Sequence, residues 1–403
     1  ASLNRMAFPL PERPSIAVLP FDNLSGDPEQ TYLSDGISEN VITDLSRFKQ
    51  LFVIARSSSF AYKDKPVKVR QVAEELGVQY VLEGSVQKLE DRVRITAQLI
   101  DAMSGYHIWA ERYDKSLKDV LSVQDEITQA IVATVASQIL GDAQEKLSKA
   151  EVKDFGLWDY VLRARAHHFR FTKDDNEQGK ELLQEALKLD PDFAPAHWRL
   201  AWAHYLDFFF RWSENSRQSL ETAHEHAQRA VDLEPANYQG HWVLGRVSLW
   251  KRQYDQAEAS FSRALELNPS NADLIMIWAN TMVFLGQAEE ALPLAHEAMR
   301  LNPVKHPAFY SATLALAQFF NGRYDDAIAT LQKSGRLSSP SHRLMAASYA
   351  QSDRVAEAQP HVKAVLEARP NFSVAKFGKA LPFKRQDELE LYLTALRKAG
   401  LPE

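Results

Sequence analysis

A short phrase that ends in proline recurs along the second half of the chain and constrains its fold more than any other feature. Four copies combine a polar residue, leucine, a second polar residue and proline, and two further prolines continue the spacing. Successive prolines are 44, 34, 34, 37 and 30 residues apart. A period of this length is typical of stacked helical hairpins, each of which buries its apolar face only against its neighbours. The prolines are Pro191, Pro235, Pro269, Pro303, Pro340 and Pro370.

Small residues stand at fixed distances before these prolines, at positions where paired helices must approach closely. In the repeat that ends at Pro269 they lie 24, 12 and 5 residues before the proline, and the repeat that ends at Pro303 keeps the same offsets. The two sets are Gly245, Ala257 and Ala264, and Ala279, Ala291 and Ala298.

This pattern resembles the tetratricopeptide repeat. The resemblance includes the pair Leu244-Gly245 in a first helix and the phrase Tyr254-Asp255-Gln256-Ala257 that leads into a second. It implies a solenoid of six helical hairpins, with an insertion around 208–216 in the second and a last helix, 387–399, over the open end. The predicted repeats are 158–191, 194–235, 238–269, 272–303, 307–338 and 341–370.

The first 140 residues carry a different pattern. Short apolar or alternating runs predict strands, and apolar residues at helical spacing, such as Ile37, Val41 and Leu45, predict helices. The order β-α-β-α-β-β-β-α predicts an α/β (α+β) domain with a mixed sheet, followed by the all-α solenoid. The predicted strands are 15–21, 51–55, 80–88, 92–101 and 107–113, and the helices are 37–48, 69–76 and 119–140.

Four stretches of this region resemble the TolB-like N-terminal domain that precedes tetratricopeptide repeats in many bacterial class III adenylate/guanylate cyclases and in some winged-helix transcriptional regulators. The stretches are PSIAVLPF (14–21), LSDGI (33–37), YVLEGSV (80–86) and IWAERYD (108–114). The resemblance implies that catalysis or DNA binding lies in a separate domain upstream of residue 1. In the cyclase arrangement a membrane helix stands before this region, which would place it in the periplasm, and without that helix it would be cytoplasmic.

We therefore predict five segments. The chain begins at Ala1 without a methionine, which favours a part of a longer protein. The segments are a linker over 1–14, a TolB-like domain over 15–141, a connecting helix over 142–157, six repeats over 158–370 and a C-terminal capping helix within 371–403.

Composition excludes several classes of function. The formal charge is −6, with 47 Lys+Arg against 53 Asp+Glu, so we expect no nucleic-acid binding by this chain. The absence of cysteine excludes disulfides and thiolate metal sites. The longest nearly apolar stretch, 130–140, is far shorter than the roughly 20 residues that span a bilayer.

No catalytic, cofactor or metal-binding motif stands out. Phosphate-binding glycine loops, a nucleophile elbow and the H-E-x-x-H pattern are all absent from the sequence. Asp22 to Asp27 offers oxygen ligands but lacks the full set of a calcium loop, and a turn explains it better. Histidines gather between His167 and His226, where two or three could meet around a metal, and packing histidines are the simpler interpretation. We predict no catalytic residue, cofactor or metal.

The first helices of the repeats give a sharper hypothesis. Positions three before, one after and four after the small residue are expected to face the concave side of the solenoid. Near its centre these positions hold three tryptophans and a tyrosine flanked by two arginines, which suits an apolar peptide or a ligand with a carboxylate. The predicted groove residues are Arg165, His168, Trp198, Trp202, Tyr205, Trp242, Arg246, Met276, Asn280, Leu316 and Phe319, with Val161, Leu249, Val283 and Ala312 beside them. A second interpretation is that neighbouring helices or the segment 208–212 cover these rings and make them core.

Three functions remain open at this point. The first is a regulatory module of a membrane-anchored cyclase that binds a protein or peptide, the second is the same module of a winged-helix regulator, and the third is a free-standing scaffold. A self-contained enzyme would need a further domain, and only about thirty residues follow Pro370. Homodimerisation through the sheet edge or the solenoid is compatible with the sequence.

Overall fold

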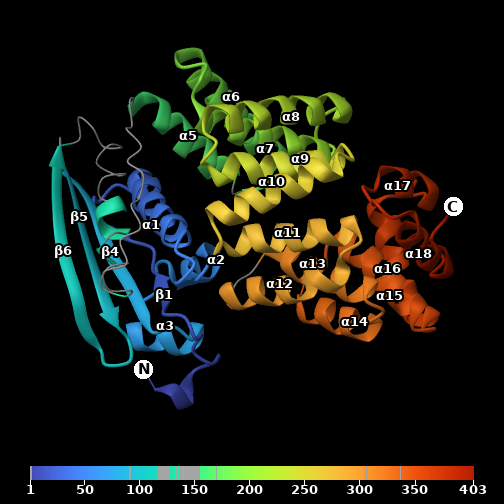
Figure 1. The fold of residues 1–403 in the computed structure, drawn as a ribbon, viewed down its shortest axis with the longest axis horizontal. Helices are drawn as coiled ribbons and strands as arrows, with labels where there is room; N and C mark the ends of the chain where they lie inside the picture. Colours follow the sequence, from blue (N-terminus) through green and yellow to red (C-terminus); the bar gives the residue numbers. More distant parts are fainter. Residues whose placement is uncertain are drawn as a thin grey trace. The chain divides into compact units, whose positions relative to one another are not determined.

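Strands and short helices form the first part of the computed structural model, and a run of paired helices forms the rest (Figure 1). The structure describes residues 2–89, 92–116, 128–132, 134–135, 139, 155–168, 170–304, 307–335 and 337–403. Two units are distinguished. Unit 1 comprises Ala1–Val247, Ser262–Asn271 and Leu301–Lys305, and unit 2 comprises Ser248–Phe261, Ala272–Arg300 and His306–Glu403.

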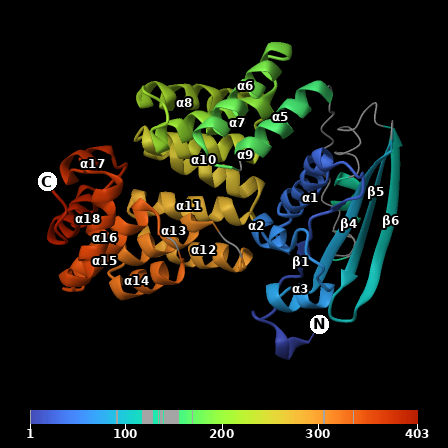
Figure 2. The same cartoon turned by 180° about the vertical axis from the view of Figure 1, so that it is seen from behind.

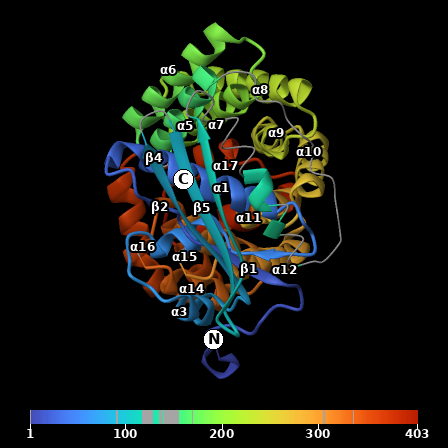
Figure 3. The same cartoon turned by 90° about the vertical axis from the view of Figure 1, so that its left-hand side faces the viewer.

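The described strands make one mixed sheet, as the sequence predicts, with six strands in place of the five predicted. Its order is β3-β1-β4-β5-β6, with β2 also paired to β4. Strand β1 pairs in parallel with β3 and β4, and β2 pairs in parallel with β4. Strand β5 is antiparallel to both β4 and β6, and Figure 3 shows β4 and β5 along the sheet. The strands are β1 Ser15–Val18, β2 Asp22–Asn23, β3 Phe52–Val53, β4 Tyr80–Leu89, β5 Arg92–Asp101 and β6 Tyr106–Ser116.

The predicted strand 15–21 is shorter in the structure, where β1 ends at Val18 and a second short strand, β2, begins at Asp22. Both strands pair with β4, but Pro20 between them has no N–H for the ladder. Phe21 turns its ring towards Gly84 of β4, where a Cβ would lie only 2.7 Å from that ring. Glycine at position 84 therefore makes room for the phenylalanine at the break.

Helix α1 (Thr31–Leu45) supplies the main cover of the sheet, and α3 (Val69–Leu76) lies on the same side (Figures 1 and 2). Ile37, Val41 and Leu45 of α1 join one core with alternate residues of β5. Helical residues 128–132 add Ile131 to this core. The rest of the predicted helix 119–140, apart from 134–135 and 139, and the connecting helix up to residue 154 lie outside the described residues. The remaining short helices are η1 Leu3–Arg5, η2 Pro28–Gln30, α2 Arg56–Ser59 and η3 Phe60–Tyr62.

Paired helices follow from residue 155 onwards, consistent with the tetratricopeptide-type solenoid. The small residues Gly245, Ala257 and Ala279 are all buried, as close helix packing requires. The helices are α5 Phe155–His168, α6 Lys173–Leu189, α7 Ala194–Phe210, α8 Ser216–Leu233, α9 Tyr238–Trp250, α10 Tyr254–Leu267, α11 Ala272–Leu285, α12 Ala288–Leu301, α13 Ala308–Phe320, α14 Tyr324–Lys333, α15 Ser339–Gln351 and α16 Val355–Ala368. Within the described ranges no helix is long and apolar enough to cross a membrane.

The tail contains the predicted last helix, 387–399, and a further short helix before it. It forms α17 (Val374–Ala380) and α18 (Gln386–Lys398), joined by a segment that binds elsewhere in unit 2. The Arg252 guanidinium donates to the carbonyl of Leu381 at 3.1 Å, and the Tyr254 hydroxyl donates to that of Phe383 at 2.9 Å. These long-range contacts hold the segment between the two helices in place.

Two turns between helices dock on the N-terminal domain within unit 1. After α10, the Asn268 amide donates to the carbonyl of Thr43 at 3.3 Å, and Ser270 N–H donates to that of Ser46 at 3.1 Å. After α12, the Asn302 amide donates to Ser57 Oγ at 2.9 Å and accepts from Ser58 Oγ at 2.6 Å. Both asparagines are 0% exposed.

Replacing Asn302 by alanine is expected to lower the free energy of unfolding by about 2–3 kcal/mol, because the buried hydrogen bond with Ser58 and the part-buried one with Ser57 are both lost. Urea unfolding measures this. The matched control is Asp190→Ala, at the equivalent turn of the first repeat, where the side chain is not buried and accepts one bond from Asp192 N–H. We expect the control to cost less than about 1 kcal/mol, and equal losses in the two variants would show that the docking contributes no stability.

Candidate functional site

The predicted groove positions separate into two classes by burial. Residues four after the small position belong to the helix packing, since Tyr205 is 2% and Phe319 0% exposed. His168 is also buried, with its ring against α6 at Gly179. These residues, together with Leu249 and Val283, cannot line an accessible groove in this structure, because their side chains point between packed helices. The expectation of a groove is corrected for this set.

The two flanking arginines also differ from the prediction. Arg165 is only 8% exposed and forms an ion pair with Glu39 of α1. Glu39 in turn pairs with Arg56 at 2.7 Å. The N-terminal domain therefore covers Arg165, a contact that the repeat pattern does not contain.

The most accessible part of the predicted groove in unit 1 is a cluster that we call the tryptophan patch, made of Trp202, Trp242 and Arg246. All three side chains are half-buried. The Trp202 ring centroid lies 4.9 Å from that of Trp242 in an edge-to-face arrangement. Arg246 Nε donates to the Tyr205 hydroxyl at 2.9 Å, which fixes the guanidinium beside the rings. The patch is thus held together by a ring contact and a hydrogen bond, and it is partly open to solvent.

Ring contacts continue from the tryptophan patch towards the end of α7. Tyr205 stacks on Trp202 at 5.2 Å and lies 5.7 Å from Phe209, which touches Phe210 at 5.2 Å. Residues 208–210, predicted as an insertion between helices, are helical and extend α7. Phe209 and Phe210 are 38% and 45% exposed. Segment 208–210 therefore covers Tyr205 but leaves an apolar surface at its own end, a feature that offsets within the repeat did not predict.

In unit 2 the predicted residues are mostly core. Met276 is 0% exposed, whereas Asn280 and Leu316 are half-buried. The ring of Phe319 packs edge-on against Tyr324 and Tyr392, the latter from α18. Trp198 in unit 1 is likewise buried, at 8% exposure. The sequence pattern identified these helix faces, but the neighbouring elements decided which residues stay accessible.

The histidines form hydrogen-bonded pairs. His197 Nε2 donates to the carbonyl of Pro191 at 2.9 Å, so its Nδ1 accepts from His226 Nδ1 at 2.8 Å. His342 and His361 make the same Nδ1 to Nδ1 contact at 2.9 Å. In both pairs the first histidine stands four residues before the small residue of its helix, and the second stands three residues after the small residue of the next helix. Throughout the described residues no group of three His, Asp or Glu is arranged to hold a metal ion.

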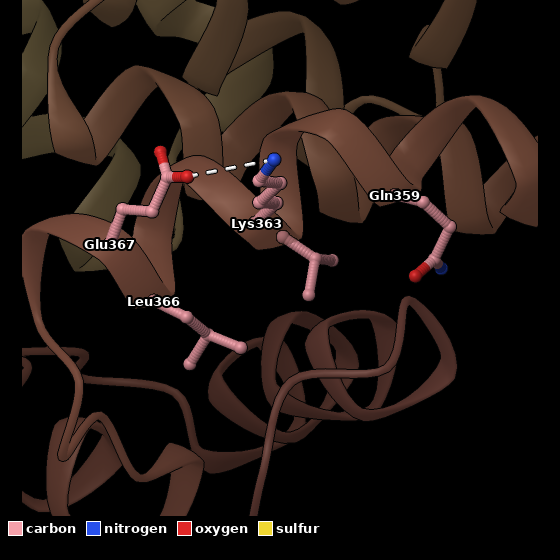
Figure 4. Close-up of a pocket in the computed structure, with 5 residues that line it drawn as sticks. Gln359, Lys363, Leu366 and Glu367 are labelled. Carbon is pink, nitrogen blue, oxygen red and sulfur yellow. Dashed lines mark ion pairs between the residues drawn. The ribbon is translucent and has the colours of Figure 1, made fainter.

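A hollow beside α16 carries no recognisable chemistry. Figure 4 shows Lys363 and Glu367 joined by an ion pair of 3.7 Å. All its lining residues come from one helix, and no polar groups converge on a common point. They are Gln359, Val362, Lys363, Leu366 and Glu367.

Burial and the charges of His197 and His204 lower the pKa of His226 to about 4. Because this pKa lies below the ordinary value near 6.5, the unfolded chain takes up the proton first as pH falls. The contribution of neutral His226 to the free energy of unfolding is therefore complete above about pH 6.5 and is lost as the pH falls below that value. We expect His226→Gln to reduce the loss between pH 7.0 and 4.5 by about 1–2 kcal/mol, after allowing for partial solvent screening. Urea unfolding at both pH values measures it.

The control for this prediction is His107→Gln, since His107 is exposed on β6. An unchanged pH dependence in His226→Gln would contradict the assignment of acid sensitivity to the histidine pair.

Two protein families match parts of the chain. Residues 12–130 match the family described as "HilA/YgeH-like transcriptional regulator, second domain", and residues 216–272 match "Tetratricopeptide repeat". A solved structure titled "Functional Characterization of Pseudomonas Aeruginosa pilF" aligns with 54% of this chain and 93% of its own, at 17% identity and a TM-score of 0.40.

Two curated relatives align over long stretches. "Putative adenylate cyclase 3" of Rhizobium meliloti (strain 1021) is 44% identical over 249 residues, which is 62% of this chain and 42% of the relative. "Transcriptional regulator HilA" of Salmonella typhimurium (strain LT2) is 22% identical over 323 residues, which is 79% of this chain and 56% of the relative. The chain thus spans about half the length of the curated relatives it matches. Its repeat region is a tetratricopeptide-type protein-interaction module, joined to an N-terminal mixed-sheet domain.

Proposed function

We propose that this chain is a non-catalytic regulatory module that binds a peptide on the tryptophan patch and passes the signal to another domain of a longer protein. The single observation that carries this proposal is the pair Trp202 and Trp242, half-buried and held at 4.9 Å beside Arg246. Tryptophan and arginine are the residues that most often dominate the energetics of protein interfaces. A rigid aromatic surface also loses little conformational entropy when a ligand binds.

The docked turns provide a route from the repeats to the N-terminal domain. Asn268 and Asn302 hydrogen-bond to that domain, and Arg165 pairs with Glu39. A ligand changes such an arrangement only if it binds one state better than another. We propose that peptide binding on α7 and α9 shifts the population of arrangements at these contacts.

For the longer protein we propose a membrane-anchored class III adenylate/guanylate cyclase. The 44% identity to "Putative adenylate cyclase 3" over 249 residues supports this choice. The proposed segments are those predicted from the sequence, with the N-terminal domain as a TolB-like domain over 15–141 and the repeats over 158–370. The region would lie in the periplasm if a membrane helix precedes it and in the cytoplasm otherwise.

A second candidate is the same module in a winged-helix transcriptional regulator. The match of residues 12–130 to the HilA/YgeH-like second domain favours it, as does the alignment of 79% of the chain with HilA. Both candidates give the chain the same task, and they differ only in the domain that receives the signal. Translation of the full reading frame upstream of residue 1 separates a cyclase domain from a winged helix.

Peptides selected from a random phage-displayed dodecapeptide library for binding to this chain test the tryptophan patch. We expect Trp242→Ala to weaken their binding about tenfold to thirtyfold, because the truncation removes an aromatic anchor. Fluorescence anisotropy gives Kd, and circular dichroism gives Tm. The matched control, Tyr106→Ala, removes an aromatic ring that is 77% exposed on β6 and should leave Kd unchanged. Equal Kd values for wild type and Trp242→Ala would exclude the tryptophan patch as the peptide-binding site. A loss of binding accompanied by unfolding would exclude it as well.

The isolated chain should form no cyclic AMP or cyclic GMP from ATP or GTP in the presence of Mg²⁺ or Mn²⁺. The physical reason is that no group of acidic side chains in the described part of the chain is arranged to hold the metal that such chemistry uses. A chromatographic assay at micromolar protein measures this. Cyclic nucleotide production that scales with protein concentration would overturn the non-catalytic assignment.

A further inference from the structure

One arginine that the repeat offsets did not select has no ion pair with any carboxylate of the described residues. Arg199 on α7 is half-buried and lies over the indole of Trp198, with its guanidinium carbon 4.2 Å from the ring centroid. Its Nε is buried and has no hydrogen-bond partner, and none of the described acidic side chains forms an ion pair with it. A partly buried cation without a partner is costly, since burial removes solvation that nothing replaces.

The surroundings of Arg199 increase this cost. Arg165 of the adjacent helix α5 lies close enough to repel it, and the carboxylate of Glu39 is already shared by Arg165 and Arg56. Asp35 on α1 is paired with Lys63 at 2.5 Å. Among these six described side chains, four cations accompany two carboxylates, a formal charge of +2 for the set.

The pKa values of the two arginines agree with this excess of positive charge. Burial lowers the pKa of Arg199 to about 9, and burial together with the charge of Arg199 lowers that of Arg165 to about 9. Both guanidinium groups stay protonated at neutral pH, so the lowered values express the cost of holding two like charges together. His168 gives no compensation, because burial and the charge of Arg199 keep its pKa low, at about 3.

We propose that Arg199, with Arg165 beside it, forms an oxyanion-binding site that takes the carboxylate of the peptide bound on the tryptophan patch. A guanidinium stacked on an indole presents its edge to pairs of oxygen atoms, the geometry that carboxylates and phosphates share. Trp198 and Trp202 are four residues apart on α7 and therefore lie on the same face of the helix, one turn from each other. The statement that the oxyanion is the carboxylate of a bound peptide rests on the proposed function. The statement that Arg199 binds an oxyanion does not.

The site therefore specifies the chemistry of its ligand. An acidic side chain or a chain terminus would lie about 5–6 Å, one helical turn, from the apolar side chain that contacts Trp202 and Trp242. Phosphate oxygens would satisfy the same guanidinium, so the experiment separates the two sources of the oxyanion.

Thermal unfolding of the chain is measured with sodium glutarate, with sodium phosphate and with sodium chloride at equal ionic strength. We expect glutarate to raise Tm by about 2–4 °C over chloride, because a ligand that binds only the folded state stabilises it. A larger shift with phosphate than with glutarate would overturn the assignment to a carboxylate. No shift with either anion would overturn the site itself.

Arg199→Met removes the charge and keeps the apolar stem. We expect it to leave Tm without oxyanion unchanged or higher, because an uncompensated cation has been removed, and to abolish the glutarate shift. The matched control, Arg217→Met, removes an exposed arginine of α8 and should keep the shift. A lower Tm for Arg199→Met, or a shift that survives in it, would identify Arg199 as a structural residue.

Two further variants complete the test. Arg199→Lys keeps the charge without the planar fork and should retain less than half of the shift. If neither Arg199 variant folds, the guanidinium is structural and the proposal fails. Trp242→Ala should keep the whole glutarate shift, because the probe carries no large apolar side chain that would need the tryptophan patch. Failure of peptide binding and failure of oxyanion binding are thereby distinguished.

Discussion

The close approach of helices at small side chains is the constraint on which the solenoid depends. Ala201, Ala257 and Ala279 are all 0% exposed, and each lies where a larger side chain would separate two helices. The packing at these positions fixes the rotation of every first helix about its axis. It therefore also decides which neighbouring side chains enter the packing and which reach the surface. The tryptophan patch is one consequence of this rotation.

The turns between repeats show how one motif serves two purposes. In the phrase that ends each repeat, the residue before proline is Asp190 or Glu234 in two copies and Asn268 or Asn302 in two others. The asparagines are buried against the N-terminal domain, whereas the acidic residues are not. An amide can both donate and accept a hydrogen bond without burying a charge. The exchange of carboxylate for amide thus marks the turns that dock.

Charge is balanced unevenly where the N-terminal domain meets the first repeats. Glu39 of α1 pairs with Arg165 and Arg56, and no carboxylate in the described ranges forms an ion pair with Arg199. Stability alone would favour an apolar residue at such a position. The persistence of an unpaired guanidinium on a tryptophan is therefore better explained by a ligand than by folding, and this connects the charge of the site with the aromatic surface one helical turn away.

The sequence by itself determined the periodic part of the structure. Proline spacing, buried small residues and alternating strands are local patterns, so the mixed sheet and the paired helices follow from residues near one another in the chain. Tertiary contacts decided the rest. The ion pair of Glu39 with Arg165 and the docking of Asn302 on Ser57 and Ser58 both depend on residues brought together from distant segments. The position of a residue within the repeat predicts which face of a helix it occupies. Its solvent access depends on what packs against that face, and the packing partners differ from one repeat to the next.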